Sequence, residues 1–118
     1  MHQRIEVDWG GNTIGLTWYP NKILNPSEIV TSVHSFCFRE GKVMLVHVAN
    51  RGFNIPGGHV EYSENPEDAL HREVYEEGYV TGEITYIGAI EVDHKTNSSF
   101  LKGGVIHSLD INYFTEWI

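Results

Sequence analysis

The sequence is short of cysteine and of long apolar runs, and each shortage excludes a class of protein. Among its 118 residues there is one cysteine, Cys37, so an internal disulfide is excluded. No apolar run approaches the ~18 residues that a membrane-spanning helix needs. The first residues, MHQRIEVDW, lack the apolar segment of a signal peptide. We therefore expect a cytoplasmic protein with no membrane partner.

Basic side chains are also scarce. The sequence has 8 Lys and Arg residues against 16 Asp and Glu residues, which gives a formal net charge of -8. Binding to a long nucleic acid depends largely on Lys and Arg side chains that neutralise phosphates, so this balance argues against such a partner. A small phosphorylated substrate remains compatible, because a divalent cation can supply positive charge locally.

The length and the 41% of hydrophobic residues predict one domain, spanning residues 1–118, with one modest core. Gly10, Gly11 and Asn12 indicate a tight hairpin turn between two short strands. One later segment, VMLVHVA, is apolar almost throughout and predicts a strand that is covered on both faces. The predicted strands span residues 4–9, 13–19, 30–38, 42–49, 83–92 and 105–114.

One helix stands out among these strands. Asn65 is a favourable N-cap and Pro66 suits the first helical position, so the helix is expected to begin there. It should run to about residue 77 and stop at Gly78, a preferred C-terminal residue. Leu70 and Val74 form its predicted core stripe. Residues 51–63 before it indicate an ordered loop with a short strand, and the whole pattern predicts an α+β fold.

The helix also carries a cluster of carboxylates. On an ideal helix Glu73, Glu76 and Glu77 fall within about 100° of one another. Their mutual repulsion is relieved by a hard divalent cation such as Mg²⁺, which prefers oxygen ligands and can activate water. Arg72 precedes Glu76 by four residues and can pair with it. A solvated acidic helix face is the alternative interpretation of the cluster.

The segment PGGH ahead of the helix favours the metal interpretation. The backbone at Gly57 and Gly58 can approach a ligand closely because neither residue has a side chain. A glycine-rich loop that leads into a carboxylate-bearing helix is difficult to explain as surface decoration. His59 follows the two glycines, and it either contacts a phosphate or is an ordinary loop residue.

Residues 58–80 resemble the Nudix box. That motif is a Gly, five residues, a Glu, seven residues, and then Arg-Glu-aliphatic-any-Glu-Glu-any-Gly-aliphatic. Here the specified positions are filled by Gly58, Glu64, Arg72, Glu73, Val74, Glu76, Glu77, Tyr79 and Val80. The likeness extends over roughly residues 28–114. It implies a MutT-like Nudix fold: a mixed β-sheet with a loop-helix-loop, in an α/β/α sandwich whose C-terminal helix is short or absent.

The resemblance also implies an activity and a set of site residues. A Nudix hydrolase cleaves a diphosphate linkage in a nucleoside triphosphate or other nucleoside-diphosphate derivative, with Mg²⁺ or Mn²⁺. The implied metal ligands are Glu73, Glu76, Glu77 and the backbone carbonyl of Gly57. Glu73 or Glu76 would act on the attacking water, Arg72 and Glu64 would orient the ligand carboxylates, and Gly58 and His59 would contact substrate.

Tyr79 is the one departure from the motif, which has Gly at this position. We expect Gly78 to replace that glycine and to end the helix one residue sooner, which puts the direction of Glu77 in question. Tyr79 and the short C-terminal part also leave an alternative function open: a Nudix-fold module that binds a nucleotide or a protein without cleaving it. A homodimer through the edge of the N-terminal hairpin is compatible with the sequence.

Overall fold

A computed structural model describes residues 3–49, 52–94 and 107–117 of the chain. The described part consists of strands and a single helix, α1 (Pro66–Gly78). The strands are β1 (Gln3–Trp9), β2 (Asn12–Pro20), β3 (Val30–Arg39), β4 (Lys42–Val43), β5 (Val46–Val48), β6 (Gly52–Asn54), β7 (Gly57–His59), β8 (Gly82–Asp93) and β9 (His107–Trp117). None of the described helices is long and apolar enough to cross a membrane.

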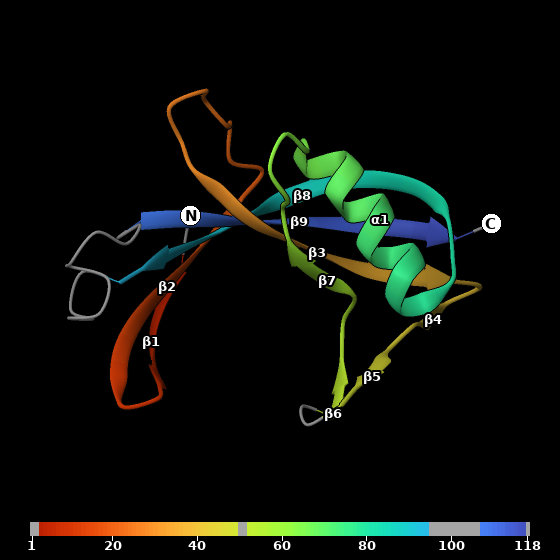
Figure 1. Ribbon diagram of the computed structural model, residues 1–118, viewed down its shortest axis with the longest axis horizontal. Coiled ribbons are helices and arrows are strands. Elements are labelled where there is room, and N and C mark those ends of the chain that lie inside the picture. The colour runs from red at the N-terminus through yellow and green to blue at the C-terminus, as the bar shows by residue number, and fades with distance from the viewer. Residues whose placement is uncertain (1–2, 50–51, 95–106, 118) are drawn as a thin grey trace.

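The main sheet is mixed and strongly curled (Figure 1). Its strand order is β1-β2-β8-β9-β3-β4, and β7 pairs with β3 outside this path. The pairing of β3 with β9 is parallel, whereas the other pairs of the sheet are antiparallel. Strands β5 and β6 form a separate antiparallel ribbon. This arrangement confirms the predicted α+β fold with a mixed sheet.

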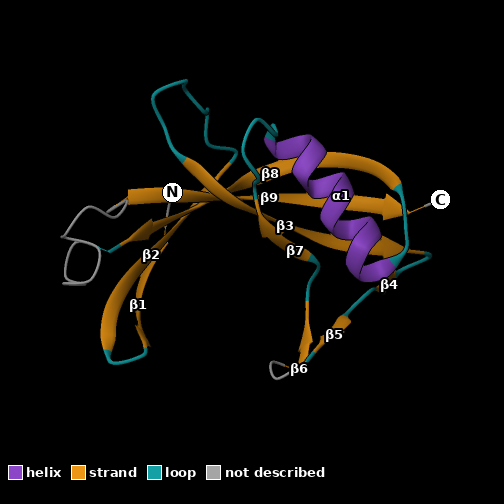
Figure 2. Cartoon of the chain, in the orientation of Figure 1, coloured by secondary structure: helices purple, strands orange, loops and turns teal. Residues whose placement is uncertain are grey.

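Helix α1 covers one face of the sheet (Figure 2). The predicted stripe of Leu70 and Val74 is buried there, against Val33 and Cys37 of β3 and Ile111 of β9. The other side chains of β3 alternate onto the opposite face, so the strand presents different residues to the helix and to the concave side. The described residues contain no second helix.

The helix begins as predicted and ends one residue later than predicted. The Asn65 side chain accepts a hydrogen bond of 2.8 Å from the Asp68 amide, and Pro66 follows as the first helical residue. At the other end Gly78 is still helical, and Tyr79 takes the left-handed conformation with a φ of 57°. The prediction that Gly78 caps the helix is therefore wrong. Tyr79 performs the turn at the position where the motif has glycine.

The segment 42–49 does not form one strand covered on both faces, and that prediction is wrong. It divides into β4 and β5, and Val43 and Leu45 are exposed over 60% and 55% of their surface. Met44 and Val46 turn the other way and pack near Gly78, at the end of α1. An apolar run does not reveal whether its strand lies in the centre or at the edge of a sheet, and β4 lies at the edge.

The remaining strand predictions hold within the described residues. The β1–β2 turn uses Gly10 and Gly11 with φ values of 62° and 88°, the left-handed pair that a two-residue hairpin turn requires. The segment 51–63 contains two short strands, β6 and β7, where one was expected. The last strand begins at His107, while residues 105 and 106 of its predicted span lie outside the described residues.

Candidate active site

The glycine pair lies where the loop before α1 meets the sheet. Gly57 pairs with His34 of β3, and a Cβ at this position would collide with the carbonyl oxygen of Val33 and the ring of His34. A Cβ on Gly58 would lie 2.6 Å from the Glu73 carboxyl carbon. Gly57 therefore needs to be glycine, because backbone occupies the space, whereas at Gly58 the flexible end of the Glu73 side chain would have to move. The loop backbone consequently lies directly against a carboxylate of the helix.

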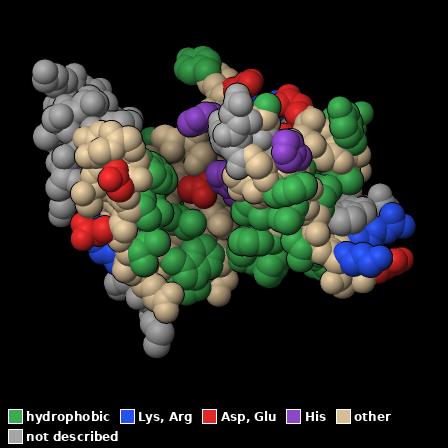
Figure 3. Space-filling model, turned by 90° about the horizontal axis from the view of Figure 1, so that it is seen from below, with side chains coloured by type: hydrophobic (Ala, Val, Ile, Leu, Met, Phe, Trp, Pro, Cys, Tyr) green, Lys and Arg blue, Asp and Glu red, His purple; other side chains and the backbone are tan. Residues whose placement is uncertain are grey.

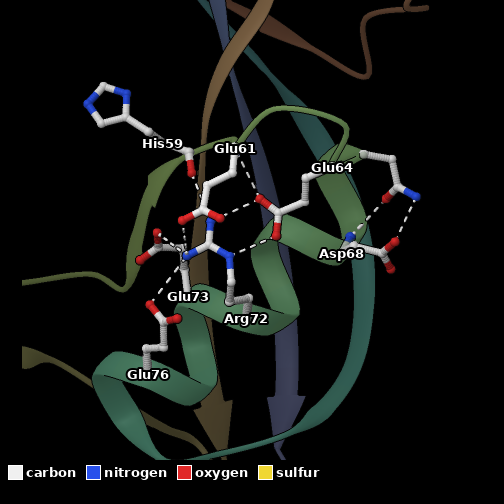
Figure 4. A network of polar contacts seen from close by, with 8 residues as sticks. His59, Glu61, Glu64, Asp68, Arg72, Glu73 and Glu76 are labelled. Carbon is white, nitrogen blue, oxygen red and sulfur yellow. Dashed lines mark hydrogen bonds and ion pairs between the residues drawn. The ribbon is translucent and has the colours of Figure 1, made fainter.

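Arg72 is the centre of the polar contacts around this loop (Figure 4). Its Nε donates to Glu64 Oε2 at 2.7 Å and its Nη2 donates to Glu64 Oε1 at 2.9 Å. This two-pronged geometry joins the guanidinium to the carboxylate more specifically than a single contact does. The Glu61 amide also donates to Glu64, at 2.9 Å. Glu64 and Arg72 therefore fix the loop to the helix.

The same guanidinium also contacts two carboxylates of the predicted metal site. Arg72 Nη1 lies 3.0 Å from Glu73 Oε1 and 3.3 Å from Glu76 Oε2. The Glu76 contact is the predicted pair four residues apart on the helix. Arg72 Nη2 donates to the backbone carbonyl of His59 at 3.0 Å, while the imidazole of His59 points away from the guanidinium (Figure 4).

The charges of this network shift its ionisation. The hydrogen bond from Arg72, with the backbone hydrogen bond from Glu61, lowers the pKa of Glu64 from 4.5 to about 2. The hydrogen bond to Glu64, followed by the charges and contacts of Glu73 and Glu61, raises the pKa of Arg72. Glu64 is thus ionised and paired throughout the neutral range, and it holds the arginine that touches Glu73.

Glu77 is oriented by the loop. Its Oε1 accepts a hydrogen bond of 2.8 Å from the amide of Gly57. The Tyr79 departure placed the direction of this side chain in question, but the helix continues through Gly78 and carries Glu77 towards the loop. The left-handed Tyr79 therefore preserves the helical position of Glu77 without a glycine.

These residues border a cavity of about 520 Å³. Figure 3 shows a hollow with acidic and histidine side chains at its base and hydrophobic side chains on both sides. Lys and Arg are absent from the described residues that line the cavity. The described lining consists of Trp9, Thr31, Ser32, His34, Gly57, Gly58, His59, Glu61, Glu73, Glu77, Val92, His94 and Ser108.

The structure brings most, but not all, of the predicted site residues to this cavity. Gly57, Gly58, His59, Glu73 and Glu77 line it. The cavity lining does not include Glu64, Arg72 or Glu76. Arg72 contacts both of these glutamates and also Glu73, which does line the cavity. The side chain of Glu76 is 56% exposed. The predicted carboxylate cluster is thus divided between the cavity and the helix surface beside it.

The donor chemistry of the carboxylates fits a hard divalent cation, since Glu73, Glu76, Glu77 and the Gly57 carbonyl offer only oxygen ligands. As they are placed, however, Glu73 and Glu76 face Arg72, and Glu77 faces the Gly57 amide. No group of three or more acidic, histidine or cysteine side chains within residues 3–49, 52–94 and 107–117 is arranged to hold a metal ion. Rotation of these carboxylates would be needed to bind one.

A second polar network, which the sequence did not reveal, lies on the sheet side of the cavity. Asp110 Oδ1 accepts from Ser32 Oγ at 2.8 Å and lies 2.8 Å from His34 Nδ1. The other oxygen, Oδ2, accepts from Asn112 Nδ2 at 3.1 Å. Burial lowers the pKa of His34, but the hydrogen bond to Asp110 and the nearby carboxylates outweigh it and raise that pKa above 6.5. Only the parallel register of β3 and β9 brings these residues together.

Comparisons with known proteins identify the family and the fold. The NUDIX domain family matches residues 29–117 of the chain. A crystal structure of the Bacillus subtilis pyrophosphohydrolase BsRppH, in a mutant form, is similar with a TM-score of 0.69 and 27% sequence identity. That match covers 96% of this chain and 65% of the BsRppH chain, so this chain spans about two thirds of its length. A comparison with curated proteins found no match.

Proposed function

This chain belongs to the NUDIX domain family, and on that premise we propose that it is a pyrophosphohydrolase of a small nucleotide-like substrate, dependent on Mg²⁺ or Mn²⁺. The name of BsRppH supports the reaction class, and the shortage of basic residues favours a small substrate over a long nucleic acid. A cytoplasmic location remains part of this proposal.

One observation carries the proposal. The Gly57–Gly58 backbone and the Glu73 and Glu77 side chains of α1 border the same cavity, although they come from a strand and a helix. Gly58 allows the loop to lie against the Glu73 carboxylate, and Gly57 donates to Glu77. Carboxylate oxygens can bind the metal ion, and the backbone of two adjacent glycines allows a diphosphate to approach closely.

The residues that would hold the cation are Glu73, Glu76, Glu77 and the carbonyl of Gly57. A bound cation would neutralise charge on the diphosphate and lower the pKa of the attacking water. Arg72 orients Glu73 and Glu76 through its Nη1, and Glu64 holds Arg72 in turn. Glu73 or Glu76 accepts the proton of the water that attacks phosphorus. The P–O bond to the bridging oxygen then breaks. The phosphate that was attacked carries the oxygen of the water, and the leaving phosphate keeps the bridging oxygen.

The test is metal-dependent turnover by the intact chain. Product formation from nucleoside triphosphates, dinucleoside polyphosphates and nucleotide sugars in Mg²⁺, Mn²⁺ or EDTA is measured by separating substrates and products on an anion-exchange column. We expect at least one compound to be hydrolysed with metal and none in EDTA. Glu73→Gln should lower kcat about 100-fold or more, since it removes a carboxylate from the reacting end. Glu67→Gln, on the exposed first turn of α1, is the matched control and should retain activity.

Full metal-dependent turnover in Glu73→Gln would show that the site is assigned wrongly. Calorimetry on the same compounds separates the rival function. An enzyme gives heat that continues with turnover, whereas a saturable heat without product would indicate a module that only binds its ligand.

A further inference from the structure

The N-terminal hairpin lies outside the family match and still contributes to the cavity. The match begins at residue 29, whereas β1 and β2 end at Trp9 and Pro20. Trp9, the last residue of β1, lines the same cavity as Glu73 and Glu77. The hairpin therefore adds a wall that the motif residues do not provide.

Two contacts hold this hairpin in place. Strand β2 pairs with β8 from Gly15 to Pro20, which extends the main sheet. Arg4 of β1 reaches across β2, through the space that a side chain on Gly15 would fill, to a 3.7 Å ion pair with Asp93 of β8. Asp93 lies in the chain between Val92 and His94, both of which line the cavity. Trp9 is thus carried by an anchored strand and a two-residue turn.

The indole of Trp9 is placed to contact a ligand. Half of its surface, 50%, is exposed, although a tryptophan on a small domain is usually well covered. Its ring lies 6.3 Å from the ring of His94, at a tilt of 52°. Val92 lines the cavity beside them. An exposed aromatic face at a cavity is a platform on which a planar ring can stack.

The cavity is therefore lined from two parts of the fold. Carboxylates and glycine backbone come from α1 and β7, whereas Trp9 and Val92 come from β1 and β8 and lie in the lining together with His94 and Ser108. Its volume of about 520 Å³ lies within the range of sites for small organic ligands. We propose that Trp9 stacks on the planar heterocycle of the substrate, and that the hairpin thereby selects nucleotides over other diphosphates. This inference rests on the proposed function, because it assigns a further part of the same site.

Binding is measured apart from turnover. The probes are ATP and UTP analogues with methylene groups in place of the oxygens that bridge phosphorus atoms, in Mg²⁺, and the equivalent triphosphate without a nucleoside. We expect the ATP analogue to quench tryptophan fluorescence at a lower concentration than the UTP analogue, because its ring is larger. The nucleoside-free triphosphate should leave the fluorescence unchanged.

Variants assign the effect to Trp9. For Trp9→Ala, calorimetry should show a Kd for the ATP analogue that is about tenfold higher, with little change for the nucleoside-free triphosphate. Trp9→Phe should keep most of the affinity but lose the fluorescence signal. Trp18, whose ring packs over Gly88, is the control, and Trp18→Phe should preserve both the affinity and the quenching.

The outcomes separate this inference from the proposed function. Equal affinity of Trp9→Ala and the natural chain for the ATP analogue would overturn the stacking role, even if hydrolysis is observed. An absence of quenching by either nucleotide analogue would overturn it as well. Quenching that Trp9→Ala abolishes, in a chain that hydrolyses nothing, would support the role of Trp9 while the hydrolase proposal fails.

Discussion

Two polar networks meet at the cavity, and they differ in how the chain builds them. The network around Arg72 is local, because its partners lie between His59 and Glu76. The network around Asp110 joins residues that are 76 and 78 positions apart, through the parallel pairing of β3 and β9. The first is highly charged and partly exposed, and the second gathers neutral donors and one imidazole around a nearly buried carboxylate.

The difference indicates that the two networks have different roles. Helical spacing and a short loop suffice to place Arg72 against Glu64 and Glu73, so this network orients carboxylates at the reacting end. Asp110 of β9 instead joins this strand to β3 and holds His34 at the cavity wall. Variants should therefore affect turnover most in the first network and stability most in the second.

Arg72→Ala should have the largest effect on turnover. It removes the group that orients Glu73 and Glu76, and loss of such a group typically lowers activity about 10–100-fold. Arg72→Lys should be intermediate, because an ammonium keeps the charge but cannot contact Glu64 through two prongs. Steady-state kinetics on the substrate found above provide the measurement. Arg39→Ala, at the exposed end of β3, is the control. Equal kcat for Arg72→Ala and Arg39→Ala would contradict the assignment.

Asp110→Asn should affect stability more than turnover. It leaves Ser32 and His34 without their carboxylate acceptor, at a cost of about 1–3 kcal/mol in the free energy of unfolding. The pKa of His34 should fall, because burial still acts on the ring while the favourable charge is gone. This pKa is measured by NMR in the metal-free protein. Glu116→Gln, exposed on the same strand, is the control.

The stability difference should also depend on pH. In the natural chain the pKa of folded His34 is raised above 6.5, so its protonation stabilises the fold fully below pH 6.5 and loses this effect as the pH rises through the folded value. Asp110→Asn lacks this contribution. Urea unfolding should therefore show a larger gap between the two proteins at pH 6 than at pH 9, and a constant gap would contradict the role of the pair.

Tyr79→Gly should have the smallest effect and the opposite sign. A residue with a Cβ in the left-handed region costs about 1 kcal/mol, so glycine should raise the free energy of unfolding by roughly that amount. The ring contact of Tyr79 with Tyr75 is lost, which reduces the gain. Tyr79→Ala keeps the backbone strain and should not stabilise. Denaturant unfolding measures both variants, and turnover should stay unchanged if the helix end alone is affected.

The contrast between the networks explains what could be predicted from the sequence. The N-cap at Asn65, the core stripe of Leu70 and Val74 and the pairing of Arg72 follow from helical periodicity and from a motif of fixed spacing. The β1–β2 turn follows from two adjacent glycines. All of these features depend on residues close together in the chain, so their geometry is fixed by local rules.

The remaining features depend on distant pairing. Asp110 and His34 are ordinary strand residues in the sequence, and only the register of β3 and β9 brings them together. The exposure of Val43 and Leu45 follows from the edge position of β4, which the apolar pattern did not reveal. The place of Trp9 at the cavity follows from the curl of the sheet, which brings the hairpin there and has no local signature in the sequence.

The position of β9 has a consequence for how the molecule comes to be made. This strand lies between β8 and β3, in the middle of the sheet, although it is the last of the described strands along the chain. During synthesis β3 could not pair with its parallel neighbour β9 until residues 107–117 had left the ribosome. Contacts of such long sequence separation form slowly. The nascent chain would therefore expose the apolar faces of β3 and β8 until then, and a chaperone that shields strand edges should raise its folding yield.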